Sequence, residues 1–214
     1  MNRWVRGAAW LVLGLSASAA TAADEKDKGG WVSLFDGKTL SGWTALELRG
    51  QGTSHWDVKD GVIVGSGEPS MLFSPQGHYK NFRYRAEVKI NDQGNSGMYV
   101  RTAKKASFTD GYEIQINSTH RDPIKTGSVY TMVHIYKQIV PPDTWFTQQV
   151  EVVDRNYRGQ VVPHIKVWVN DELLYEYLDH TKSFRQGHFA FQQHDPGSRI
   201  EIRKVEVMEL PESK

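Results

Sequence analysis

The run Phe82-Arg83-Tyr84-Arg85-Ala86-Glu87-Val88-Lys89-Ile90 decides the fold class. Every second residue from Phe82 to Ile90 is apolar, and a charged residue stands at each position between them. Because successive side chains of an extended chain point to opposite faces, this run has one apolar face and one charged face. Such a segment is typical of a β-strand in an antiparallel sheet that packs one face on a core and turns the other to water.

Segments of similar character, bounded by turn residues, recur along the chain. The turn signals between them include Asp60-Gly61, Asp110-Gly111 and Asp195-Pro196-Gly197. We expect further strands at residues 62–65, 97–102, 112–117, 129–136, 146–154, 164–170, 173–177, 188–193 and 199–210. No window shows a sustained helical stripe, so the choice is between a sandwich and a barrel. The chain length favours an all-β fold, a two-sheet antiparallel jelly-roll sandwich.

Composition excludes several classes of function. The 26 basic and 25 acidic residues are interspersed and give a net charge of +1, and no basic stripe or polybasic helix indicates nucleic acid or a membrane surface as partner. The absence of cysteine excludes thiol chemistry, zinc-thiolate sites, disulfides and a lipid-acceptor cysteine. The 7 Trp, 9 Tyr and 8 Phe can supply both a core and a surface on which sugars stack.

The N-terminal residues have the order of a secretory signal. Arg3 and Arg6 precede the apolar run at residues 8–15, and small residues follow up to Ala23. This apolar run is shorter than the ~20 residues that span a bilayer, so we expect cleavage after about residue 23 rather than a membrane anchor. Residues 24–30 are charged and lack periodicity, which predicts a disordered leader before a single domain at residues 31–210.

Two neighbouring strands carry polar side chains on the face opposite their apolar one. In the first strand these residues are Tyr99 and Arg101, and in the second they are Glu113 and Gln115. If the two strands pair, the four side chains form a continuous polar patch. A groove lined in this way suits a hydroxyl-rich ligand. The alternative is an ordinary exposed sheet face with an Arg–Glu cross-strand pair.

A third candidate region lies near the C-terminal end of the chain. Gln192 and His194 share a face where a strand ends, and a histidine there could shuttle protons near neutral pH, although a surface role is the alternative. The polar loop at residues 118–126, which contains His120, is long enough to border a site. The other histidines show no two-histidine metal spacing, so the sequence names no metal ligands.

Several stretches in the same order resemble one known family. They lie at residues 34–43, 56–63, 79–82, 94–101, 111–116, 126–130 and 203–207, and examples are Leu34-Phe35-Asp36-Gly37 and Gly94-Asn95-Ser96-Gly97-Met98-Tyr99. The chain resembles the 3-keto-disaccharide hydrolase domain family from about residue 31 to 210. The resemblance implies a concanavalin A-like jelly roll and cleavage of glycosides whose C3 hydroxyl has been oxidised to a ketone. Asp195 departs from the family pattern, which usually has glycine after the histidine.

The resemblance also implies a set of site residues. Its distinctive stretches include Asn95, Ser96, Tyr99, Arg101, Glu113, Gln115, Tyr130, Gln192 and His194. Glucanases of the same fold use the pattern Glu-x-Asp-x-Glu, which here reads Glu113, Gln115 and Asn117. Since a retaining mechanism needs two carboxyl groups, that mechanism is disfavoured on this strand.

A C3 ketone would allow a different route, because it acidifies the C2 proton and permits elimination of the C1 substituent. Glu113 or His194 would abstract that proton, and Arg101 would stabilise the enolate oxygen. Tyr99, Gln115 or Tyr130 would hold sugar hydroxyls or protonate the leaving oxygen. Water would then add back, so that the net reaction is hydrolysis.

The expected partners follow from this chemistry. They are a carbohydrate-derived substrate and a sugar 3-oxidoreductase that generates the ketone, in the periplasm or outside the cell. No cofactor is certain, although a divalent cation could polarise the ketone. Two other classes remain open: a non-catalytic carbohydrate-binding module on the same fold, and an interaction domain whose sheet face binds a protein and would show an exposed apolar patch.

Overall fold

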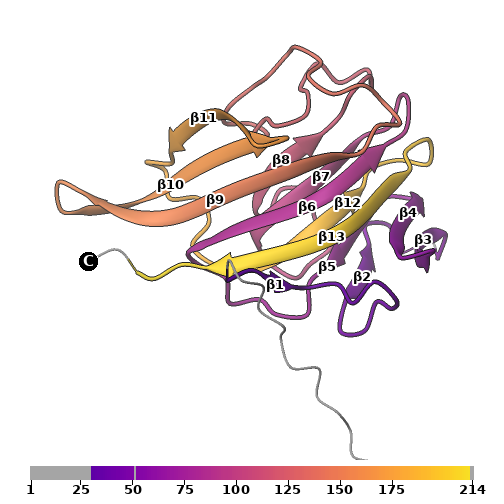
Figure 1. Cartoon of the computed structure of the whole chain (residues 1–214), viewed down its shortest axis with the longest axis horizontal. Helices are drawn as coiled ribbons and strands as arrows, with labels where there is room; N and C mark the ends of the chain where they lie inside the picture. The colour runs from indigo at the N-terminus through magenta and orange to yellow at the C-terminus, as the bar shows by residue number, and fades with distance from the viewer. Residues whose placement is uncertain (1–29, 51, 213–214) are drawn as a thin grey trace, which may run out of the picture.

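The computed structural model describes residues 30–50 and 52–212, and this part of the chain folds into two antiparallel β-sheets packed face to face (Figure 1). The strands are β1 (Val32–Ser33), β2 (Thr44–Glu47), β3 (Ser54–Lys59), β4 (Val62–Gly67), β5 (Ser70–Phe73), β6 (Phe82–Ile90), β7 (Ser96–Thr102), β8 (Tyr112–Ile116), β9 (Phe146–Tyr157), β10 (Gln160–Val169), β11 (Glu172–Leu178), β12 (His188–Gln193) and β13 (Ile200–Glu209). The predicted two-sheet sandwich is confirmed.

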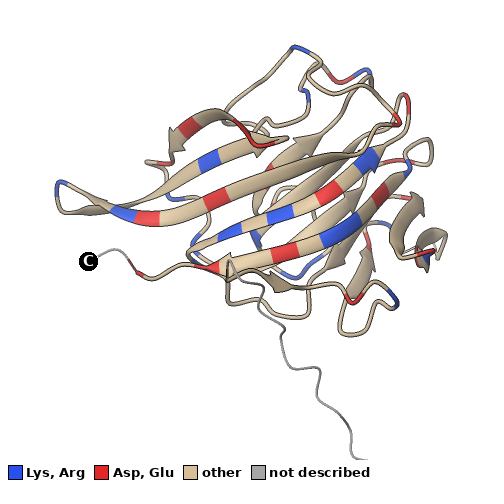
Figure 2. Ribbon diagram, in the orientation of Figure 1, with Lys and Arg blue, Asp and Glu red and all other residues tan. Residues whose placement is uncertain are grey.

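The larger sheet has the strand order β11-β10-β9-β6-β13-β4-β3, with β1 paired to β13. Strand β6 lies in its middle and alternates as its sequence predicts, with its apolar side chains from Phe82 to Ile90 fully buried. Its charged side chains form cross-strand ion pairs on the outer face, where Arg83 lies 2.6 Å from Glu151 and Arg85 lies 2.7 Å from Glu206. Figure 2 shows this outer face as alternating basic and acidic residues along β9, β6 and β13.

The smaller sheet has the order β2-β5-β12-β7-β8 and packs its inner face on the larger one. The Phe189 ring of β12 stacks on the Tyr84 ring of β6 with 3.9 Å between centroids. Met98 of β7 and Ile114 of β8 belong to the same core, as the alternation of those strands predicts. The opposite face of β7, β8 and β12 is therefore turned away from the core, and it carries the polar residues of interest.

One predicted strand was wrong. Residues 129–136 form only isolated bridges, from Val129 to Ile114 and to Val133. The segment turns sharply because Thr131 has a φ of 68°, so the chain follows β8 only briefly. Its place at the edge of β8 is held by hydrogen bonds between backbones, including Tyr130 N to Glu113 O at 2.9 Å.

Four short strands escaped prediction, namely β1, β2, β3 and β5. Strand β5 has all four residues buried, so its sequence shows no alternation. The predicted signal peptide and most of the predicted leader, residues 1–29, lie outside the described residues. No helix in the described ranges is long and apolar enough to cross a membrane.

Candidate active site

A polar pocket of about 430 Å³ opens on the face of the smaller sheet that points away from the core. Strands β8 and β12 form its floor, Asn95 lines it just before β7, and the loops that contain residues 108–111, 122–132 and 183–184 contribute walls. Six of the predicted site residues line it, namely Asn95, Glu113, Gln115, Tyr130, Gln192 and His194. These residues come from segments almost 100 positions apart in the chain, and the pairing of β7 with β8 and β12 brings them together.

The floor of the pocket depends on a glycine. Gly97 of β7 pairs with Gln115 of β8, beside the pair formed by Tyr99 and Glu113. A Cβ atom at position 97 would lie 2.4 Å from Glu113 Oε1, too close for any contact between these atoms. Glycine at this position therefore leaves the space that the Glu113 carboxyl group occupies.

Glu113 is the buried acid of the pocket. Burial raises its pKa to about 8, the nearby charge of Asp122 acts in the same direction, and a hydrogen bond with Tyr99 opposes the shift. Its carboxyl group consequently holds a proton at pH 7, whereas an ordinary glutamate would be ionised. With the Gln115 amide oriented to satisfy its neighbours, its nitrogen lies 3.2 Å from Glu113 Oε1. A protonated carboxyl group at the floor of a polar pocket can donate a proton to a ligand oxygen.

Tyr99 and Gln192 form a pair beneath the pocket. Gln192 Nε2 donates to the Tyr99 hydroxyl at 3.0 Å, and this hydroxyl donates to the Phe108 carbonyl at 3.1 Å. Gln192 Oε1 is buried and has no hydrogen-bond partner among the described residues. A buried acceptor without a donor is costly, and this atom can accept one further hydrogen bond.

Tyr130 and Asp122 form the opposite wall. The Tyr130 hydroxyl donates to Asp122 Oδ2 at 2.9 Å, and this bond raises the pKa of Tyr130 to about 12. Asp122 lies on the loop at residues 118–126, which the sequence predicted to border a site. The loop is anchored by Asn117, whose Nδ2 donates to the Ile124 carbonyl at 2.7 Å. Asp122 itself was not predicted as a site residue, and its position depends on a loop conformation that no motif indicates.

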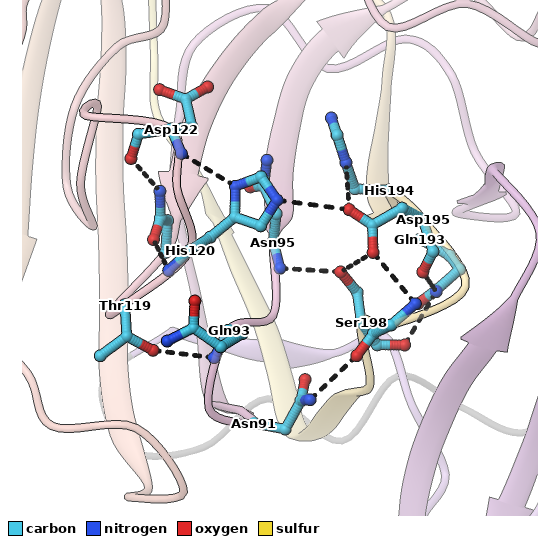
Figure 3. A network of polar contacts seen from close by, with 12 residues as sticks. Asn91, Gln93, Asn95, Thr119, His120, Asp122, Gln193, His194, Asp195 and Ser198 are labelled. Carbon is cyan, nitrogen blue, oxygen red and sulfur yellow. Dashed lines mark hydrogen bonds and ion pairs between the residues drawn. The ribbon is translucent and has the colours of Figure 1, made fainter.

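His194 takes part in a hydrogen-bonded cluster at the rim. Its Nδ1 lies 2.9 Å from Asp195 Oδ2, and His120 Nε2 lies 3.5 Å from the same oxygen (Figure 3). The Phe108 ring stacks on the His194 ring with 5.7 Å between centroids. The association of His120 with His194 could not be predicted from the sequence, because the two residues lie on separate loops with no shared spacing.

The spacing of this cluster suits a metal ion, but its hydrogen bonds do not. His120, His194 and Asp195 each place a potential ligand atom within 4.8 Å of the others. The backbone N–H of Asp122 donates to His120 Nδ1 at 3.1 Å, so a neutral His120 carries its proton on Nε2, the atom that faces Asp195. Burial lowers the pKa of His120, which favours this neutral form. In this arrangement Nε2 of His120 carries a proton rather than a free lone pair, and the three side chains form a hydrogen-bonded group.

Arg101 does not lie in the pocket, contrary to the predicted placement. Its φ of 52° and a register shift between β12 and β7 mark a bulge, which breaks the two-residue alternation and turns the side chain away from Glu113. The buried guanidinium donates to Asp154 Oδ1 at 2.9 Å and to the Phe184 carbonyl at 3.1 Å. It borders a second cavity at the far end of the sheet together with Lys80 and Asp154. Arg101 is not among the residues that line the pocket around Glu113.

Fold and pocket together define a concanavalin A-like β-sandwich with a polar ligand site on the face of one sheet. The chain belongs to the family described as the 3-keto-alpha-glucoside-1,2-lyase-like domain, whose profile matches residues 30–208. This match confirms the resemblance found in the sequence.

A curated relative is the 3-keto-disaccharide hydrolase of Bacteroides thetaiotaomicron, which is 29% identical over 194 residues. The alignment covers 74% of this chain and 62% of the relative, so the chain spans less than two thirds of that protein's length.

Two solved structures resemble this chain in their fold. A candidate glycosyl hydrolase from Parabacteroides distasonis superposes with a TM-score of 0.66 and 19% identity, covering 84% of this chain and 99% of that one. The carbohydrate-binding module CBM66 of Bacillus subtilis superposes with a TM-score of 0.59 and 17% identity, covering 78% of this chain and 96% of the module.

Proposed function

We propose that the chain is an exported enzyme that cleaves 3-keto-glycosides by eliminating the C1 substituent and then adding water. The family membership supports the substrate class, and the relative from Bacteroides thetaiotaomicron carries a name of the same kind. The observation that carries the proposal is the pocket itself. A buried, protonated Glu113 and the imidazole of His194 line one cavity, so that an acid and a base can reach the same ligand.

The reaction uses the ketone in place of a second catalytic carboxylate. A carbonyl group at C3 acidifies the C2 proton, and a protein base removes it. The electron pair of the C2–H bond forms the C1–C2 double bond as the C1–O bond breaks, and the leaving oxygen takes a proton. Water adds to the double bond afterwards, with hydroxide at C1 and a proton at C2. The products are a free 3-keto sugar and the released alcohol or sugar.

A retaining double displacement does not suit this pocket. Strand β8 supplies one carboxyl group, Glu113, and the second carboxyl group in the pocket belongs to Asp122. Both Asp122 side-chain oxygens already accept hydrogen bonds, Oδ1 from Ile124 N at 2.8 Å and Oδ2 from the Tyr130 hydroxyl at 2.9 Å. Asp122 is thus engaged as a structural acceptor rather than placed as a nucleophile.

Polar groups around the pocket would hold the sugar. Gln192 Oε1 would accept a bond from a sugar hydroxyl, and Asn95, Gln115 and Tyr130 offer further donors and acceptors. Tyr99 lies beneath the pocket and would contribute indirectly, through its hydrogen bond with Gln192. The substrate must come from an enzyme that oxidises a C3 hydroxyl, and the sequence of residues 1–23 supports a periplasmic or secreted location.

The experiment compares 3-keto-trehalose with unoxidised trehalose, each with and without a chelator. We expect cleavage of the keto form alone, and solvent deuterium at C2 of the released keto sugar. Cleavage of unoxidised trehalose, or a product without deuterium at C2, would contradict the proposed route. Loss of turnover with the chelator would add a divalent cation to the mechanism.

A carbohydrate-binding module is the second candidate, because the same pocket could bind a sugar and do nothing further. Glu113→Gln separates the two. In an enzyme this variant should bind 3-keto-trehalose and fail to turn it over. If the unmodified protein binds 3-keto-trehalose, 3-keto-lactose and keto-glucosides without cleaving any of them, the binding module is the correct assignment.

A further inference from the structure

Asp195 lies in the turn after β12, and both oxygens of its carboxyl group accept hydrogen bonds. Its Oδ1 accepts from Gly197 N at 3.1 Å and from the Ser198 hydroxyl at 3.0 Å. Its Oδ2 faces His194 Nδ1 at 2.9 Å and His120 Nε2 at 3.5 Å. Burial opposes ionisation of this carboxyl group, but the hydrogen bonds from His194 and Ser198 outweigh it and lower the pKa of Asp195. An ionised carboxylate can only accept, so every neighbour must donate to it.

This requirement fixes the proton on His194. Because Asp195 cannot donate, Nδ1 of His194 carries the hydrogen, and the lone pair of the neutral ring is on Nε2. Figure 3 shows that this second ring nitrogen points away from Asp195. The ring itself lines the pocket, and Phe108 stacks against it at 5.7 Å. His194 therefore presents an unprotonated nitrogen on the side away from its carboxylate partner.

His120 supports the arrangement from the other side. Its Nδ1 accepts from Asp122 N, which leaves the proton on Nε2 and directs it toward Asp195. The His120 ring also meets the His194 ring edge to face, with 5.7 Å between centroids. Ser198 is held in turn by Asn95, whose backbone N–H donates to the Ser198 hydroxyl oxygen at 2.8 Å. The charged and titratable groups around His194 are thus Asp195, His120 and, across the pocket, Asp122 and Glu113.

We infer that Asp195 is a positioning residue that holds His194 in the Nδ1–H form, so that His194 Nε2 is the base that takes the C2 proton. This inference rests on the proposed function and assigns its two proton transfers to two different residues, His194 and Glu113. The proton moves from C2 to Nε2, the electron pair stays on the sugar, and Asp195 stabilises the imidazolium that forms. Glu113 keeps its proton until it donates that proton to the leaving oxygen. In the hydration step, ionised Glu113 takes a proton from the attacking water, whose hydroxide adds to C1. The imidazolium exchanges its N–H proton with solvent and then donates a proton to C2.

Asp195→Asn tests the inference with a side chain of the same shape. We expect kcat on 3-keto-trehalose to fall by roughly 100-fold or more with little change in KM, the size of effect typical of a lost general base. Asp171→Asn, in the exposed turn between β10 and β11, is the matched control and should keep full activity. A loss below about threefold in Asp195→Asn, with turnover intact in the unmodified protein, would overturn the inference.

A readout independent of turnover reports the proton directly. In protein labelled with ¹⁵N-histidine, the two ring nitrogens of His194 should have the shifts of a protonated Nδ1 and an unprotonated Nε2, and Asp195→Asn should remove this preference. The reverse tautomer in the unmodified protein would overturn the inference. So would Zn²⁺ or Mn²⁺ bound through Nδ1 of His194, seen as metal-induced shifts of that nitrogen. This measurement stands even if no 3-keto-glycoside is cleaved, in which case the proposed function fails separately.

Proton exchange identifies the base. A 3-keto sugar without a leaving group at C1, such as 3-keto-1,5-anhydroglucitol, should exchange its C2 proton with deuterated water on the unmodified protein. We expect Glu113→Gln to retain this exchange and His194→Gln to lose it. The opposite result would make Glu113 the base and would refute the role of His194.

Discussion

Gly97 and Glu113 occupy neighbouring strands so closely that a methyl group on one would overlap the carboxyl group of the other. The Cβ atom of an alanine at position 97 would lie 2.4 Å from Glu113 Oε1 and 2.9 Å from Tyr99 Cε2. The carboxyl group is the end of a flexible side chain, so it can move while the strands stay paired. The function of the pocket is therefore more sensitive to this position than the fold is.

Gly97→Ala should thus reduce activity more than stability. We expect kcat/KM on a 3-keto-glycoside to fall by about 100-fold, since a displaced acid loses its alignment with the substrate. Thermal unfolding should shift by only a few degrees, equivalent to about 1 kcal/mol. A variant that melts far below the unmodified protein would show that the glycine serves strand packing rather than the site.

Glu113 should also make the protein less stable as pH rises. Its pKa is raised from 4.5 to about 8, so the unfolded chain releases this proton at lower pH than the folded protein does. Stability therefore falls with increasing pH between these two values, because the unfolded state binds fewer protons there.

Glu113→Gln removes this effect and should raise the melting temperature by an amount that grows from pH 5 to pH 8. Glu172→Gln, at the exposed start of β11, is the control and should show no such growth. Melting curves for the three proteins across that pH range make the comparison. A constant difference between Glu113→Gln and the unmodified protein would mean that Glu113 ionises normally in the folded state.

The rate of turnover should also depend on the proton that the Glu113 carboxyl group carries. If Glu113 donates to the leaving oxygen, kcat should decline as pH rises through about 8, where its carboxyl group loses the proton. Initial rates with saturating 3-keto-trehalose, measured from pH 6 to pH 10, give the profile. A rate that increases through the same range would identify ionised Glu113 as the base.

The sequence predicted the parts of this molecule that follow strict alternation. Strand β6 and the inward faces of β7 and β8 match their two-residue periods, and the same period placed Glu113 and Gln115 on one face. The alternation failed at Arg101, because a β-bulge is set by the pairing with β12 and leaves no local sign in the sequence. Strand β5 was missed for a related reason, since burial on both faces removes the alternation.

The rim of the pocket was harder to predict than its floor. His120 and Asp195 meet only because two loops fold toward each other, and the distance of 75 positions between them carries no signature. The family resemblance pointed to His194 but could not indicate its partners, since Asp195 is a departure from the pattern. Long-range contacts between loops therefore account for most of what the sequence left open.

Arg101 should prove structural. Its guanidinium is fully buried and donates to Asp154 and to the carbonyl groups of Lys80 and Phe184, which ties β7 to β9 and to two loops. Arg101→Ala would remove these donors from a buried site, and we expect a loss of about 3–5 kcal/mol in the free energy of unfolding. Urea unfolding measures this loss. The kcat per folded molecule should stay within about threefold, whereas a large fall in kcat without a loss of stability would restore the catalytic role that the sequence suggested.

A substitution at Gln192 should weaken substrate binding while leaving the stability of the fold nearly unchanged. Its Oε1 is buried without a partner among residues 30–50 and 52–212, so replacing the amide by an apolar group of similar length relieves that atom. Gln192→Met should therefore unfold at a urea concentration close to that of the unmodified protein, despite losing the bond from Nε2 to Tyr99. If the amide oxygen accepts a sugar hydroxyl, KM for 3-keto-trehalose should rise by about tenfold, the effect of one lost hydrogen bond, with kcat changed much less. An unchanged KM would mean that the substrate does not reach this part of the pocket.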